Sequence, residues 1–149
     1  MRKIDLIVIH CSATCEGQEY TPEHLDSDHR ARGFDGAGYN YYIRVSGEIV
    51  SLRPIEKIPA HVKGYNRHSL GICYEGGLDR FGQPCDTRTP EQKKSLRVLL
   101  LLLLVRFPGC RICGHRDLSP DKNGDGHISS DEWLKQCPCF DVEKEYGVL

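Results

Sequence analysis

Three residues of the types that bind zinc are spread along the 149-residue chain: His10, His115 and Cys137. His10 ends an apolar run that begins at Asp5, and His115 follows the short apolar segment 110–114. Both runs are typical of buried strands, and a sheet can bring the ends of two strands to one rim. Three protein ligands with a fourth position open are typical of catalytic zinc. These residues therefore predict a hydrolytic zinc site.

Other thiols offer competing arrangements. Cys139 is an alternative ligand to Cys137, and Cys110, Cys113, Cys137 and Cys139 together would form a structural four-thiolate site. Cys110 and Cys113 point to opposite faces if segment 110–114 is a strand, which disfavours that site. Because the sequence shows no export signal, we expect free thiols and metal ligands rather than disulfides among the eight cysteines.

A second metal-binding pattern lies between His115 and Cys137. Segment 121–132 matches the twelve positions of an EF-hand calcium loop, with Gly126 at the sharp turn. The expected ligands are the side chains of Asp121, Asn123, Asp125, Ser129 and Glu132 and the carbonyl of His127. Ser119-Pro120 occupies the place of the entering helix, so an acidic loop without calcium is the alternative.

Hydrophobic periodicity and capping residues predict the elements that must position these residues. The expected strands are 5–11, 39–45, 48–52, 69–75 and 110–114, and the expected helices are 22–32 and 90–107. Thr89 and Gln92 fit a capping box at the start of the second helix. His24 and His29 are five residues apart on the first helix, and we expect both at the surface. The prediction is one α/β domain, a mixed sheet of about five or six strands flanked by helices.

The composition excludes some classes of function. A net charge of −1 with scattered Lys and Arg disfavours a nucleic-acid binder. The longest apolar stretch, Val98 to Val105, is far shorter than the roughly 20 residues of a membrane span. No secretory signal is visible at the N-terminus. We expect a monomer that is made in the cytoplasm.

Several sequence blocks, in this order, resemble those of one enzyme family. They are 9–14 (IHCSAT), 38–41 (GYNY), 60–73 (AHVKGYNRHSLGIC), 76–79 (GGLD), 89–92 (TPEQ), 114–117 (GHRD) and 135–141 (KQCPCFD). By these blocks the chain resembles the zinc-dependent N-acetylmuramoyl-L-alanine amidases of the type-2 group. That group includes a small phage lysozyme and the animal peptidoglycan-recognition proteins.

The resemblance implies a fold and an activity. It implies that residues 1–149 form a single amidase domain that cleaves the bond between N-acetylmuramic acid and L-alanine in peptidoglycan, with 121–132 as an insert. By it, His10, His115 and Cys137 hold zinc, and Tyr39 and Lys135 are catalytic, with either as the base. The block around them makes His61, Asn66 and His68 candidates for the groove that binds muramyl peptides.

Two other functions remain open at this point. A module that recognises muramyl peptides without cutting them is disfavoured, because recognition-only members of the family lack the cysteine ligand. A regulatory protein with structural zinc would need a fourth protein ligand. The expected setting is the bacterial cell wall, reached as a phage or prophage lysin, a delivered effector or a scavenging enzyme.

Overall fold

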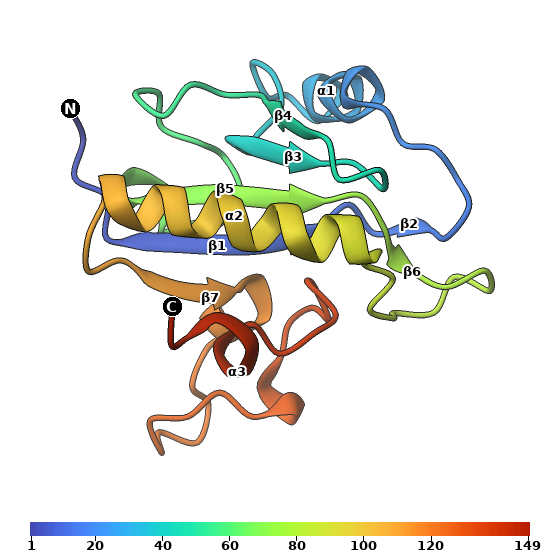
Figure 1. Ribbon diagram of the computed structural model, residues 1–149. Helices are drawn as coiled ribbons and strands as arrows, with labels where there is room; N and C mark the ends of the chain where they lie inside the picture. The colour runs from blue at the N-terminus through green and yellow to red at the C-terminus, as the bar shows by residue number, and fades with distance from the viewer.

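A five-stranded mixed sheet runs through the middle of the molecule (Figure 1). The computed structural model describes residues 1–149. The strand order is β4 (Ile49–Ser51), β3 (Tyr41–Ile43), β5 (Ser69–Tyr74), β1 (Leu6–Cys11) and β7 (Arg111–Gly114). Only β3 and β4 pair antiparallel, whereas β1 pairs parallel with both β5 and β7. The predicted mixed sheet is confirmed.

Three helices flank this sheet: α1 (Pro22–Ala31), α2 (Pro90–Arg106) and α3 (Val142–Tyr146). The predicted capping box starts α2, since the backbone N–H of Gln92 donates to Thr89 Oγ1 over 3.1 Å and Gln92 Oε1 accepts from Thr89 N–H over 3.0 Å. None of the helices has both the length and the apolar content needed to cross a bilayer. Three 3₁₀ turns complete the elements, at η1 (Asn66–His68), η2 (His115–Leu118) and η3 (Ser130–Glu132).

The alternation of side chains along β1 gives the two faces of the sheet different roles. Ile7 and Ile9 are fully buried and belong to one core cluster with Leu96 and Leu100 of α2. His10 lies between Ile9 and Cys11, so its side chain projects from the opposite face, where α1 packs. The apolar pattern of the strand therefore directs His10 away from α2.

The structure corrects three expectations. Strand β3 is shorter than predicted and spans only Tyr41–Ile43, although the backbone N–H of Asn40 still donates to the Gly71 carbonyl over 2.9 Å. Two segments expected to be loops form a small separate sheet, β2 (Thr14–Cys15) with β6 (Gly77–Leu78). The surface placement of His29 was wrong: it is buried, and its Nδ1 accepts a hydrogen bond from Gly38 N–H over 2.8 Å.

Candidate active site

Three candidate metal ligands come together at one rim of the sheet. Nitrogen or sulfur atoms of His10, His115 and Cys137 all lie within 4.8 Å of one another. His10 Nδ1 is 3.9 Å from Cys137 Sγ, and the two imidazole centroids are 4.7 Å apart. No fourth His, Cys, Asp or Glu belongs to this group. Two imidazoles and one thiolate are a donor set that suits zinc, and three protein ligands is the number typical of catalytic sites.

The register of two parallel strands accounts for the meeting of the histidines. Ile9 of β1 is level with Gly114 at the end of β7, so His10 of β1 and His115, the first residue of η2, follow at the same height. Cys137 is tied to this rim from the C-terminal segment. Its Sγ accepts a hydrogen bond from Cys11 N–H over 3.2 Å.

The alternative thiol ligands, Cys139, Cys110 and Cys113, do not join the three candidate ligands. Cys139 Sγ is 4.0 Å from Cys11 Sγ, and it is absent from the walls of the cleft to which Cys137 contributes. Cys110 and Cys113 pack in different core clusters, as expected from their alternation along the strand. All eight cysteines are free. The four-thiolate arrangement is therefore not formed.

Burial keeps the imidazoles in the neutral state that binds metal. It holds the pKa of His10 well below its usual value, and the nearby His61 and His115 lower it further. Burial, followed by the charge of Lys135, lowers the pKa of His115 to about 4. Both rings therefore have a free lone pair at neutral pH.

His61, expected in the substrate groove, bonds the candidate ligand His10. The distance from His61 Nδ1 to His10 Nε2 is 2.8 Å, and His61 Nε2 is 2.9 Å from Ser69 Oγ. A side chain at Gly71 would come within 2.9 Å of the His61 ring, so glycine makes room for it. This chain of bonds orients the His10 ring with Nδ1 towards Cys137, as outer partners of metal ligands do.

The other two groove candidates have different positions. Asn66 lines the cleft, and its Oδ1 accepts from the N–H groups of His61 and Val62 over 2.9 and 3.0 Å. It therefore shapes the loop that carries His61. His68 lies outside the cleft, half-exposed, with its Nδ1 only 2.6 Å from Asp5 Oδ1. The structure does not bring His68 to the substrate groove.

Tyr39 and Lys135 both line the cleft beside the three ligands. The Tyr39 ring centroid is 4.9 Å from that of His10. Burial raises the pKa of Tyr39 well above its usual value, so the phenol keeps its proton at neutral pH. Lys135 is exposed at the mouth and lowers the pKa of His10 and His115 through its charge.

His29 is a cleft residue that the sequence reasoning missed. Its ring lies 5.4 Å from that of Tyr39, and its Nδ1 is occupied by the Gly38 N–H, which leaves Nε2 as the protonated nitrogen. The sequence does indicate its position: His29 is four residues after the buried Leu25, so the two side chains share one face of α1.

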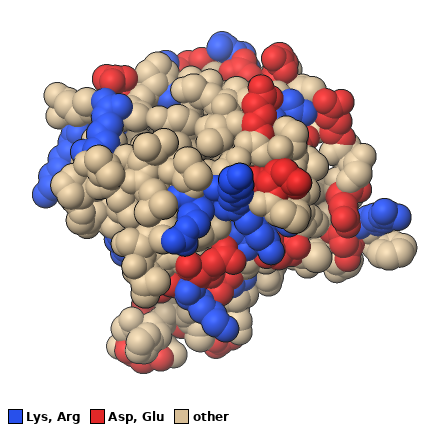
Figure 2. All heavy atoms as spheres, viewed as in Figure 1, with Lys and Arg blue, Asp and Glu red and all other residues tan.

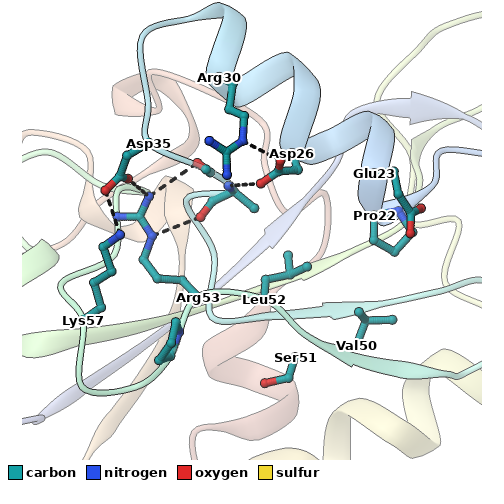
Figure 3. Close-up of a pocket in the computed structure, with 13 residues that line it drawn as sticks. Pro22, Glu23, Asp26, Arg30, Asp35, Val50, Ser51, Leu52, Arg53 and Lys57 are labelled. Carbon is teal, nitrogen blue, oxygen red and sulfur yellow. Dashed lines mark hydrogen bonds and ion pairs between the residues drawn. The ribbon is translucent and has the colours of Figure 1, made fainter.

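The candidate site opens into a cleft of about 560 Å³. A second hollow of about 550 Å³ lies between α1 and β4 (Figure 3). Its charged side chains neutralise one another: Arg30 pairs with Asp26 over 2.7 Å, and Arg53 and Lys57 pair with Asp35 over 2.8 and 2.7 Å. None of the candidate catalytic residues lines this hollow.

Three carboxylates of the EF-hand-like loop lie close together. Oxygen atoms of Asp121, Asp125 and Glu132 lie within 4.8 Å of one another. Glu132 is buried, and hydrogen bonds from Ser129 and from the backbone of Lys122 lower its pKa to about 2. No α-helix enters or leaves the loop, and its last three residues form the turn η3.

The chain is similar to known proteins in sequence and in structure. Residues 1–138 match a protein family described as N-acetylmuramoyl-L-alanine amidase. An endolysin of Klebsiella phage KP32 is 33% identical over 138 residues, which cover 93% of this chain and 82% of the endolysin. An uncharacterised protein of Haemophilus influenzae is 50% identical over 98 residues, which cover 66% of this chain and 84% of that protein.

A solved structure has the same fold. The N-acetylmuramoyl-L-alanine amidase LysC from Clostridium intestinale URNW superposes with a TM-score of 0.73 at 26% sequence identity. The superposition covers 97% of this chain and 82% of LysC. The likeness therefore extends over nearly the whole chain.

The hydrogen bond between His61 and His10 generates a first prediction. His61→Asn should lower zinc affinity by about 10- to 100-fold, because His10 loses the partner that orients it. Competition with a chromogenic chelator measures this affinity. His24→Asn, on the exposed face of α1, is the matched control and should bind zinc as the unchanged protein does. Equal affinities in all three proteins would contradict the orienting role.

The lowered pKa values generate a second prediction. Burial lowers the pKa of His61 from 6.5 to about 3, so between these values the unfolded chain binds a proton that the folded chain does not. The free energy of unfolding of the metal-free protein should be highest above pH 6.5 and fall as the pH is lowered. Urea denaturation across this range tests it. In His61→Asn the free energy of unfolding should depend less steeply on pH. An unchanged dependence would show that the lowered pKa of His61 is not its cause.

Proposed function

The chain belongs to the N-acetylmuramoyl-L-alanine amidase family and hydrolyses the amide bond between N-acetylmuramic acid and L-alanine in peptidoglycan; we propose that it does so with one catalytic zinc ion. The proposed ligands are His10 Nδ1, an imidazole nitrogen of His115 and Cys137 Sγ. The observation that carries this proposal is the convergence of these three groups within 4.8 Å at the cleft.

Each protein group has a task in the proposed reaction. When bound, zinc polarises the scissile carbonyl and lowers the pKa of an attacking water towards about 7. The Lys135 ammonium at the mouth of the cleft stabilises the negative charge that develops on the carbonyl oxygen, a contribution of about 3 kcal/mol at comparable sites. The protonated Tyr39 phenol orients the water by hydrogen bonding or relays its proton.

The substrate indicates where the protein acts. The curated relative from phage KP32 is named an endolysin. We propose that this chain likewise acts on the bacterial cell wall as a phage or prophage lysin, with muramyl peptides of peptidoglycan as its partners. All the proposed zinc ligands and both catalytic side chains come from one chain, which supports a monomer as the active unit.

We also propose that the loop 121–132 binds calcium. Its side-chain ligands would be Asp121, Asn123, Asp125, Ser129 and Glu132, together with the carbonyl of His127. The convergence of three carboxylates supports this proposal. The loop joins His115 to the segment of Lys135 and Cys137, and Ser119 Oγ accepts from Leu134 N–H across its ends over 3.1 Å. Calcium would thus stiffen the segment that carries Lys135 and Cys137.

A matched pair of cysteine variants tests the zinc proposal. Cys137→Ala should lose zinc and reduce amidase activity at least about a hundredfold, because the metal loses its thiolate. Cys139→Ala, two residues away, should keep both. Mass spectrometry of digested peptidoglycan identifies the cut by the free L-alanine amine. Full activity in Cys137→Ala, or loss of zinc only in Cys139→Ala, would reject the proposed ligand set.

Calcium binding is tested by titration calorimetry and thermal unfolding. Millimolar calcium should raise the melting temperature of the unchanged protein relative to the same protein in a calcium chelator. Glu132→Gln should abolish this rise, since it removes the bidentate ligand of position 12. Asp131→Asn, at a position without a ligand role, is the control and should respond normally. Absence of heat and of stabilisation at millimolar calcium would eliminate the calcium site.

A further inference from the structure

The outer face of α2 carries an exposed apolar stripe. Val98, Leu101, Leu102 and Val105 are spaced three or four residues apart and so lie on one side of the helix. Their exposed fractions are 46%, 41%, 64% and 84%. Figure 2, which has the view of Figure 1, shows a tan area over α2 with blue Lys and Arg and some red Asp and Glu side chains at its borders. The inner face of the same helix is buried, so this outer stripe has no role in the core.

Basic side chains surround the stripe. Helix α2 contains Lys93, Lys94, Arg97 and Arg106, all exposed, and a single acidic residue, Glu91. Only Arg106 is in an ion pair, a 3.8 Å contact with Glu56. The other three basic groups have no carboxylate partner among the ion pairs of the protein. In a chain whose net charge is −1, the positive charge of this helix is a local concentration.

The stripe faces away from the candidate active site. The inner side of α2 packs on the sheet face formed by Ile7 and Ile9, whereas His10 projects from the opposite face. A macromolecule or membrane bound to the outer side of α2 would therefore leave the cleft open to peptidoglycan fragments.

We propose that the outer face of α2 docks on an anionic lipid bilayer surface. An apolar stripe bordered by Lys and Arg is the pattern of helices that lie in the membrane interface. The apolar side chains enter the region between headgroups and acyl chains, and the basic groups contact lipid phosphates. The helix lies parallel to the surface and keeps its packing on the sheet.

A second copy of the chain fits this face less well. Two-fold pairing places the same patch on both partners, so Lys93 and Arg97 of one copy would come close to the same residues of the other. A stable protein interface also uses about 20 to 30 residues on each side, and the stripe offers four large apolar ones. Anionic lipid matches both the charge and the size of the stripe.

Sedimentation with lipid vesicles tests this proposal. The full-length protein should bind vesicles of phosphatidylglycerol and phosphatidylethanolamine, and bind phosphatidylcholine vesicles at least about tenfold more weakly. The double variant Leu102→Glu, Val105→Glu should reduce binding to the anionic vesicles by about tenfold or more. Lys93→Glu with Arg97→Glu should reduce it as well and remove its salt dependence.

Phe81→Glu is the matched control, because Phe81 is 88% exposed and lies on the loop between β6 and α2, not on the helix. It should bind vesicles as the unchanged protein does, and all variants should keep the circular dichroism and the amidase activity of that protein. No binding to anionic vesicles would overturn the proposal, as would equal losses in Phe81→Glu and the α2 variants. A dimer in analytical ultracentrifugation that Leu102→Glu, Val105→Glu dissociates would identify a second copy as the occupant instead.

Discussion

The parallel pairing of β1 with β7 is the contact on which the candidate site depends. It places Ile9 level with Gly114, and the residue that follows each of them in the chain is a histidine. Two imidazoles separated by more than 100 residues in the sequence thereby become neighbours. Their separation is set by the pairing of two strands and not by the conformation of a loop. Strand pairing fixes their height, and a hydrogen bond from Cys11 N–H holds the sulfur of Cys137 beside them. Geometry of this kind is what a metal site of three ligands requires.

One face of the sheet supplies most of the apolar core, and the other face carries the candidate active site. One face is covered by α2 and forms the largest apolar core. The other carries two smaller apolar clusters and the polar groups of the candidate site, among which His61 bonds His10 and Ser69. Close packing there depends on glycine at particular points. A side chain at Gly38 would collide with the carbonyl oxygen of Ala60, and one at Gly71 with the ring of His61.

Local patterns in the sequence predicted the five strands of the main sheet, both long helices and the capping box at Thr89. These features depend on periodicity and on neighbours a few residues away. The meeting of His10 with His115 was predicted from the position of each histidine at the end of an apolar strand. The sequence did not predict the burial of His29 or the bond from His61 to His10, since both arise from contacts between separate elements. The exclusion of His68 has the same origin: its partner is Asp5, 63 residues away.

The proposed function depends on one zinc ion bound by His10, His115 and Cys137 with no fourth protein ligand. A crystal structure with anomalous difference maps on both sides of the zinc absorption edge measures this directly. We expect a single zinc peak about 2.0 to 2.1 Å from one nitrogen of each histidine and about 2.3 Å from Cys137 Sγ. A peak bound by Cys139, or one enclosed by four protein ligands, would contradict it.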